Sequence, residues 1–307
     1  MKILIIGGTG FLGTELVRRA TAAGWETAAT YCSRPGSVTG AAGAAGAAGA
    51  AGAAGAAGAA GAAGASWHRL DLRSPGHIDE VLAAVAPSAV INATSGGSDW
   101  AVTADGSIRV AMAAARHGCR LVHVSSDAVF SGSRIHYDET CLPDPVTPYG
   151  AAKASAETAV RLLVPSAAVA RTSLIIGHGG SDGSGGSGGS VHERLVHALA
   201  AGTHDGVLFT DDVRCPVHVE DLASALLELA VSDRAGMFHL AGADALSRHE
   251  LGVLIARRDG LDAARLPVGR RSDTLMPGAL DVRLDSSATQ ERVRTRLRGA
   301  GEFLRVQ

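Results

Sequence analysis

The sequence lacks the features that mark disulfide-rich, metal-clustered, membrane-spanning and nucleic-acid-binding proteins. Its four cysteines, Cys32, Cys119, Cys141 and Cys215, are scattered without a C-x-x-C pair, which is typical of reduced thiols and supports neither a disulfide framework nor a metal site. No apolar run reaches 18 residues, and the N-terminal run ends after four. The 28 basic and 30 acidic residues, for a net charge of -2, form no block of like charge. We therefore expect a soluble, cytoplasmic protein that binds small molecules rather than nucleic acid or a membrane.

Strand-like and helix-like segments alternate through the first 175 residues. Short apolar or β-branched runs occur at 2–6, 26–31, 67–72, 88–93, 120–126 and 167–173, and helical patterns lie between them at 11–24, 76–86, 102–117 and after 148. This alternation predicts right-handed crossovers and a doubly wound parallel sheet of the Rossmann type, with helices on both faces. The fold class is therefore α/β.

The chain of 307 residues is long for a single core, which indicates a major domain with a smaller lobe. We assign residues 1–175 to a dinucleotide-binding domain, to which about 205–235 returns. The later elements are shorter and mixed, among them a helix near 191–201, a strand at 237–242 and a serine-capped helix at 247–258. Residues 176–204 and 236–307 are expected to form a smaller mixed α/β substrate lobe.

Two low-complexity segments interrupt the pattern. Residues 40–65 carry eight consecutive Ala-Ala-Gly triplets, which are either a frayed insertion or a helix that each glycine weakens by about 1 kcal/mol. Residues 177–190 have the composition of a linker, and either cover a substrate cleft or span a gap. Neither segment indicates a function.

A glycine motif follows the first strand-like run. The stretch GGTGFLG places Gly7, Gly10 and Gly13 at the opening of a helix, with Thr9, Phe11 and Leu12 between them. Glycines there permit a tight turn and the close approach of a pyrophosphate to backbone N–H groups at a helix N-terminus. The motif predicts a dinucleotide site.

The end of the second strand bears on the choice of dinucleotide. An NAD site usually has an acid here to hold the ribose 2′-hydroxyl, whereas ATYCSRPG offers Arg34, which either meets a 2′-phosphate or is a solvated loop residue. This favours NADPH, with NADH as the alternative. Asp71, followed by Leu72, is placed to accept a hydrogen bond from the adenine amine or to cap a helix.

The stretch TPYGAAK places Tyr149 four residues before Lys153 in a helical segment, so that both side chains leave on one face. A free tyrosine has a pKa near ~10, and a nearby ammonium favours the phenolate. The spacing therefore predicts that Lys153 lowers the pKa of Tyr149. The alternative is a surface turn beside a core helix.

These motifs, taken with HVSSDAVFSG at 123–132, resemble the extended short-chain dehydrogenase/reductase superfamily. The run from Val122 through SSDAVFSG, the loop YDETCLPDPVTPYGAAKASAE and the strand end ARTS are most similar to the dTDP-4-dehydrorhamnose reductase family and its sugar-nucleotide-binding relatives. The resemblance implies that Ser126, Tyr149 and Lys153 are catalytic. In the family the serine binds the substrate oxygen, the tyrosine donates a proton to it, and the lysine holds the nicotinamide ribose.

The resemblance also implies further contacts. Asn92, Ala93 and Thr94 would lie along the cofactor ribose, although Asn92 is equally explained as a buried hydrogen bonder at a strand end. The implied substrate-binding residues are Ser95, Ser126, Asp127, Ala128, Leu174 and Arg214.

Arg214 is similar to the arginine that related epimerases direct at the substrate diphosphate, unless it pairs with Glu220 or Asp221. His218 is better explained as a packed or capping residue. Ala128 stands where the family usually has tyrosine, and Leu174 where it has tryptophan, which puts the identity of the hexose in doubt.

The expected function is NAD(P)H-dependent reduction of a nucleotide-linked 4-keto-6-deoxy sugar by a monomer or homodimer, without a metal. A sugar-nucleotide epimerase or dehydratase that retains NAD is the first alternative, but Asp127 supplies only one acid beside Ser126. A non-catalytic NADP-binding regulator, like the β subunit of methionine adenosyltransferase, is the second.

Overall fold

The computed structural model describes residues 1–33, 64–177 and 189–305. The expectations for Arg34, for the Ala-Ala-Gly repeat before Gly64 and for 178–188 therefore lie outside the described residues.

A seven-stranded parallel sheet forms the centre of the molecule, which confirms the predicted α/β Rossmann-like class. From one edge to the other its strands are β12 (Gly236–Leu240), β7 (Ala168–Thr172), β5 (Arg120–Ser126), β4 (Ala89–Asn92), β1 (Lys2–Ile6), β2 (Glu26–Tyr31) and β3 (Ser66–Arg69). The chain reverses its direction across the sheet between β1 and β4. In doubly wound sheets, ligands bind beyond the carboxyl ends of the strands at such a point.

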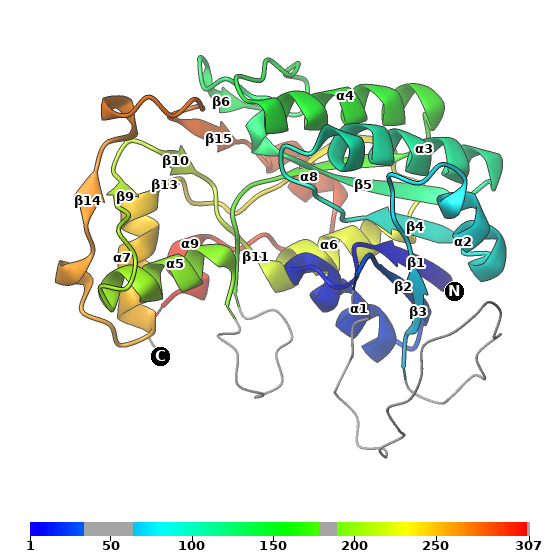
Figure 1. Ribbon diagram of the computed structural model, residues 1–307, viewed down its shortest axis with the longest axis horizontal. Helices are drawn as coiled ribbons and strands as arrows, with labels where there is room; N and C mark the ends of the chain where they lie inside the picture. Colours follow the sequence, from blue (N-terminus) through cyan, green and yellow to red (C-terminus); the bar gives the residue numbers. More distant parts are fainter. Residues whose placement is uncertain (34–63, 178–188, 306–307) are drawn as a thin grey trace.

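Helices cover both faces of the sheet (Figure 1). One face carries α1 (Phe11–Ala22) and α6 (Val219–Ala230), and the other carries α2 (His77–Val85), α3 (Ser107–Arg116) and α4 (Pro148–Leu163). A short π-helix, η1 (Ala101–Gly106), leads into α3. Each face therefore has its own apolar layer between sheet and helices.

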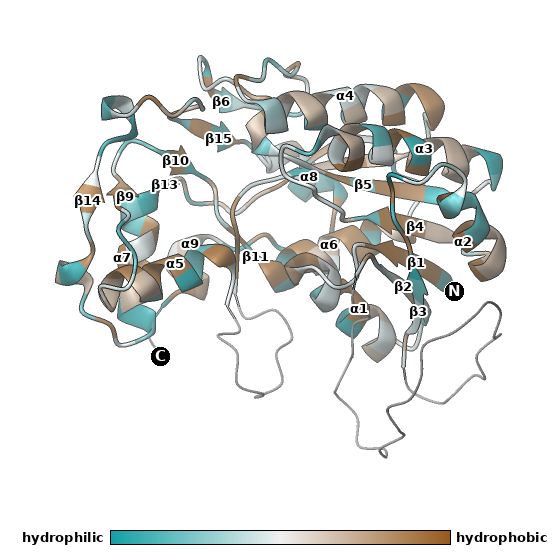
Figure 2. Ribbon diagram, viewed as in Figure 1, coloured by the Kyte–Doolittle hydropathy of each residue, from teal (hydrophilic) through white to brown (hydrophobic). Residues whose placement is uncertain are grey.

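The first strand shows why this sequence forms a buried strand. Ile3, Leu4, Ile5 and Ile6 are at most 1% exposed, and their side chains enter the two apolar layers alternately. Fully burying such a side chain contributes roughly 1.5–3 kcal/mol, and a parallel strand covered on both faces needs a continuous apolar run. Figure 2 shows this apolar colouring on β1, β4 and β5.

A smaller lobe lies beside the carboxyl ends of the strands (Figure 1). Its helices are α5 (Val191–Ala200), α7 (Arg248–Arg258) and α9 (Ala300–Phe303), and they share an apolar core. Four pairs of short strands form separate two-stranded sheets outside the main sheet: β8 (Ile175–Ile176) with β11 (Val217–His218), β9 (Leu208–Phe209) with β14 (Val268–Gly269), β10 (Val213–Arg214) with β13 (Leu246–Ser247), and β6 (Ile135–Tyr137) with β15 (Val282–Leu284). The remaining elements are η2 (Asp127–Val129), η3 (Ala263–Arg265), η4 (Arg271–Asp273) and α8 (Ser287–Arg292).

One segment lies elsewhere than the sequence indicated. Gly236–Leu240 was assigned to the smaller lobe, but it forms the edge strand β12 of the main sheet, in register with Ala168–Thr172. Phe238 and Leu240 are fully buried there, in the same apolar layer as α6. The crossover from β7 to β12 thus passes through much of the smaller lobe before α6 returns the chain to the sheet.

In residues 1–33, 64–177 and 189–305, no helix has both the length and the apolar character needed to cross a bilayer.

Close packing fixes the turn between β1 and α1. A Cβ on Gly13 would overlap the carbonyl oxygen of Gly7, so the first turn of α1 sits directly against the glycine loop. The loop is held from the other side by the amide of Gly7, which donates to Oγ1 of Thr30 at 3.1 Å.

We predict that Gly13→Ala displaces this loop, costs about 1–3 kcal/mol of unfolding free energy through overpacking and weakens dinucleotide binding. Gly24→Ala is the matched control, because Gly24 has a positive φ of 75° but no atom within 4 Å of the position that the added methyl group would take. It should lose stability by backbone strain alone and bind NADPH normally. Urea unfolding and NADPH fluorescence titration measure both effects, and normal binding by Gly13→Ala would contradict the prediction.

Candidate active site

A cavity of about 330 Å³ lies beyond the carboxyl ends of β1, β2 and β4. Its lining includes seven of the residues expected to bind a dinucleotide: Gly7, Thr9, Gly10, Asp71, Leu72, Ala93 and Thr94. Ser95, which was expected at the substrate, lines this cavity too, and so does Cys32 at the end of β2. The glycine loop and the open strand ends fit a dinucleotide, and we call this space the dinucleotide cavity.

Other residues expected at the cofactor do not line this cavity. Leu12 is buried in the apolar layer, and Gly13 serves the close packing described above. Asn92 is fully buried: its Oδ1 accepts from the amide of Thr94 at 3.2 Å, and its Nδ2 lies 3.3 Å from Oγ of Ser107. Asn92 therefore makes buried hydrogen bonds at the end of β4, the alternative to a place beside the cofactor ribose.

The start of α4 positions the expected catalytic pair. Oγ1 of Thr147 caps the helix by accepting from the amide of Gly150 at 3.0 Å, and Pro148 occupies the first turn. A Cβ on Gly150 would overlap the carbonyl oxygen of Ala128, so α4 rests directly on the turn η2 that follows β5. This contact brings the first turn of α4 against Ser126.

Tyr149 has a higher pKa than a free tyrosine, which corrects the expectation that Lys153 lowers it. Burial of the phenol is the largest cause, the charge of Asp127 acts in the same direction, and hydrogen bonding to Ser95 and Ser126 offsets part of the rise. Burial was not visible in the spacing of Tyr149 and Lys153. The phenol therefore keeps its proton throughout the neutral range.

Lys153 lies one helical turn further along and is 2% exposed. Its Nζ donates to the carbonyl oxygens of Val124 at 3.0 Å and Thr94 at 3.3 Å. Burial lowers its pKa to about 8, and the carboxylate of Glu157 offsets part of that change. The ammonium is thus anchored at the ends of β4 and β5, beside the dinucleotide cavity.

A buried ion pair holds α4 against the sheet below this site. Nη2 of Arg171 lies 2.8 Å from Oε2 of Glu157, and both residues are at most 2% exposed. Oγ of Ser125 donates to Oε1 of Glu157 at 2.6 Å. The pair links β5, β7 and α4, and so fixes the position of the helix that carries Tyr149 and Lys153.

A second cavity, of about 600 Å³, lies between the end of β5 and the smaller lobe. Its lining includes Phe11, Ser126, Asp127, Ala128, Tyr149, Leu174 and Arg214, all of which except Phe11 were expected at the substrate or the catalytic centre. We call it the substrate cavity. Tyr149 and Ser126 therefore face a space large enough for a sugar, next to the dinucleotide cavity.

Asp127 and Arg214 form a polar network in this cavity. Asp127 accepts from Oγ of Ser126 at 3.1 Å and from Oγ of Ser173 at 2.6 Å, and lies 3.6 Å from Nε of Arg214. Arg214 pairs with Asp212 at 2.9 Å rather than with the two acids of α6 that the sequence suggested. Those acids are engaged elsewhere: Asp221 with Arg298 and Glu220 with Arg19.

Sequence reasoning missed three arginines of the cavity wall, Arg194, Arg248 and Arg271. They come from α5, α7 and η4, which lie far apart in the sequence and are brought together by the smaller lobe's apolar core and its two-residue strand pairs. A serine cap before Arg248 was visible in the sequence, but no spacing connected that arginine with Arg214.

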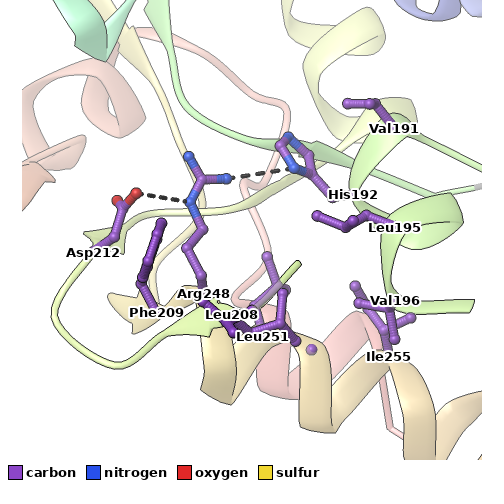
Figure 3. A pocket seen from close by; sticks show the side chains of 12 residues that line it. Val191, His192, Leu195, Val196, Leu208, Phe209, Asp212, Arg248, Leu251 and Ile255 are labelled. Atoms are coloured by element: carbon purple, nitrogen blue, oxygen red, sulfur yellow. Dashed lines mark hydrogen bonds and ion pairs between the residues drawn. The ribbon is translucent and has the colours of Figure 1, made fainter. Parts of the chain in front are cut away.

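An apolar pocket of about 330 Å³ adjoins the substrate cavity (Figure 3). Leu195, Val196, Leu208, Phe209, Leu251 and Ile255 are among its walls. Arg248 stands between Asp212 and His192 at its polar side, with Nη1 at 3.4 Å from Nδ1 of His192. Val191, His192 and Arg248 line both spaces, so the two adjoin.

Comparison with known proteins identifies the family of this chain. The family model described as RmlD substrate binding domain matches residues 1–279. The chain belongs to the RmlD substrate-binding family. It is therefore a dTDP-4-dehydrorhamnose reductase-like member of the extended short-chain dehydrogenases/reductases, as the motifs predicted.

Two curated relatives illustrate the range of this family. The dTDP-4-dehydrorhamnose reductase of Mycobacterium tuberculosis is 33% identical over 198 residues, which cover 62% of each chain. Methionine adenosyltransferase 2 subunit beta of Mus musculus is 26% identical over 279 residues, covering 87% of this chain and 73% of that one. The chain spans less than two thirds of the length of the first curated relatives it matches.

Solved structures of other proteins share the fold. The dTDP-4-dehydrorhamnose reductase of Bacillus anthracis, in complex with NADP, superposes with a TM-score of 0.74 at 18% identity and covers 99% of this chain and 96% of its own. The Bordetella bronchiseptica enzyme WbmG, in complex with NAD and UDP, gives 0.73 at 18% identity, with 96% and 88% covered. Structural relatives thus bind NADP or NAD.

We predict that the affinity for NADPH falls as the pH rises through about 8. The pKa of Lys153 is about 8 in the folded protein, below its ordinary 10.5, so the side chain loses its positive charge and one of its three N–H donors as the pH rises through this value. A pH profile of NADPH binding tests this. Tyr149→Phe should lose NADPH affinity over the same pH range, because the phenol of the wild type ionises only at higher pH and does not cause the loss. Lys153→Met should bind NADPH weakly, and its affinity should not change with pH in this range. A profile that stays flat well above pH 8 would argue against Lys153 as the ribose anchor.

Proposed function

We propose that this protein is an NADPH-dependent reductase of a nucleotide-linked 4-keto-6-deoxy sugar. The observation that carries the proposal is the position of Tyr149 and Ser126: they line the substrate cavity, while Lys153 and Ser95 adjoin the dinucleotide cavity. A carbonyl held between the two spaces would meet a protonated phenol and a serine hydroxyl, and the dinucleotide cavity would hold the cofactor beside it.

The chain's own residues have separate tasks in this reaction. A reduced nicotinamide held in the dinucleotide cavity would supply the hydride for the carbonyl carbon. Ser126, whose hydroxyl donates to Asp127 in the ligand-free protein, turns this proton to the carbonyl oxygen and orients it, and Tyr149 transfers its phenolic proton to that oxygen as the alkoxide develops. General-acid transfer of this kind typically contributes about 10²–10⁴-fold. Lys153, whose Nζ is positioned by hydrogen bonds to the carbonyl oxygens of Thr94 and Val124, would bind the nicotinamide ribose.

The raised pKa of Tyr149 suits the role of proton donor in a reduction. A phenol that keeps its proton is a ready acid for the ketone, whereas oxidation of an alcohol would need the phenolate as a base. Epimerases and dehydratases that return the hydride need the base form in part of their cycle. Asp127 does not supply a second base, because Ser173 donates to it and Arg214 lies 3.6 Å away.

NADPH is the dinucleotide we propose. The described end of β2, Tyr31 and Cys32, has no carboxylate for a ribose 2′-hydroxyl, and the following Arg34 remains the expected partner of a 2′-phosphate. The two adjoining spaces suit a substrate in two parts, with the hexose beside Tyr149 and an apolar ring toward Phe209. Residues of the smaller lobe would thus bind the nucleotide half.

Absorbance of the reduced nicotinamide, followed with a panel of dTDP-4-keto sugars, tests the proposal. We expect NADPH consumption, with kcat reduced about 10²–10⁴-fold in Tyr149→Phe and NADPH binding retained. Product without net NADPH consumption would indicate an epimerase or dehydratase. Tight NADPH binding without turnover of any keto sugar would favour a regulator, the role that the relationship to the methionine adenosyltransferase subunit supports.

A further inference from the structure

Three arginines of the substrate cavity converge on one buried carboxylate. Asp212 is 2% exposed, and its Oδ1 lies 2.9 Å from Nη1 of Arg214. Its Oδ2 lies 2.8 Å from Nη1 of Arg271 and 3.3 Å from Nε of Arg248. Figure 3 shows Asp212 and Arg248 together at the polar side of the apolar pocket. The carboxylate therefore sits where the two spaces meet.

The three guanidinium groups differ in how firmly the chain holds them. Arg214 donates to the carbonyl oxygens of Val213, Ala279 and Leu280, so both of its Nη atoms are already hydrogen-bonded to the backbone. Arg271 donates through Nη2 to the carbonyl of Pro277, but its buried Nε has no acceptor within the described part of the chain. Arg248 has, besides Asp212, only the long contact to His192 among the described residues. Arg248 and Arg271 thus retain donors for an anion.

The charges of this group do not cancel. Three arginines face the carboxylates of Asp212 and Asp127, which leaves one positive charge, and Arg194 adds another at the cavity wall. His192 contributes none at neutral pH, because burial and the neighbouring Arg248 lower its pKa to about 4. Two positive charges match the two negative charges of a diphosphate diester, which arginine forks bind well.

We propose that Asp212 is a specificity-determining internal competitor: its carboxylate occupies Arg248 and Arg271 in the ligand-free protein, and the diphosphate of the substrate must displace it. The inference rests on the proposed function only in requiring a substrate with a diphosphate.

A carboxylate about 3 Å from both guanidiniums lowers the positive potential that an incoming phosphate meets. Asp212 thus keeps the affinity for phosphate compounds moderate. Orthophosphate and other simple anions bind poorly, and a ligand must also place its nucleoside in the apolar pocket to bind tightly.

Asp212→Asn in the full-length protein tests this directly. The amide removes the competing charge but keeps the shape, while backbone carbonyls still hold Arg214 and Arg271. Calorimetric titration should show inorganic pyrophosphate and dTDP binding at least about tenfold more tightly than to the wild type, with a steeper salt dependence. If Asp212 instead serves only to order the arginines, both ligands will bind more weakly or equally, and the proposal fails.

Asp211→Asn is the matched control. Asp211 accepts from the backbone amides of Arg271 and Ser272 and does not line either space, so pyrophosphate affinity should stay at the wild-type value. Circular dichroism checks the fold of both variants. Should Asp212→Asn fail to fold, Arg248→Gln gives the second test: it should weaken pyrophosphate binding about tenfold, and unchanged binding would overturn the proposal.

These measurements are independent of turnover. A protein that binds pyrophosphate as predicted but reduces no keto sugar would contradict the proposed function and leave the role of Asp212 standing. If the protein reduces a dTDP-keto sugar but Asp212→Asn binds pyrophosphate no better than the wild type, the proposed function stands and the role of Asp212 is contradicted.

Discussion

The close contact between α4 and the turn after β5 is the constraint on which the site depends. Gly150 lies so near the carbonyl of Ala128 that no side chain fits between them. The contact places Tyr149 against Ser126 and, one turn later, Lys153 against the carbonyls of Val124 and Thr94. The ion pair of Glu157 with Arg171 holds the same helix from below. A proton donor and a cationic anchor are thus fixed at the junction of two cavities.

Burial changes the pKa values of the two groups in opposite directions. It raises the pKa of the phenol of Tyr149 and lowers that of the ammonium of Lys153, because in each case it disfavours the charged form. The phenol of Tyr149 is therefore neutral in the ligand-free protein, and Lys153 is not among the groups that shift its pKa. The smaller lobe adds the complementary feature, a cationic wall next to an apolar pocket, which suits a substrate with a charged middle and a flat apolar end.

Local sequence patterns predicted the parts of the fold that are built from local contacts. The apolar run of β1, the glycine turn into α1 and the four-residue spacing of Tyr149 and Lys153 are each legible within a few residues. The pKa of Tyr149 was predicted in the wrong direction because it depends on burial by the whole site. Arg248 and Arg271 were missed because pairs of only two residues, β10 with β13 and β9 with β14, bring them to Arg214. Such short pairs have no periodicity to detect.

The protonation state of Tyr149 is the most direct test of this account. An alkaline titration of tyrosinate absorbance, recorded for the ligand-free wild type and for Tyr149→Phe, isolates the ionisation of this phenol as the difference between the two curves. The account predicts that the difference appears above pH 10, the ordinary value for tyrosine. Ionisation of Tyr149 near neutral pH would contradict this expectation and would support the prediction from the sequence that Lys153 lowers the pKa of Tyr149.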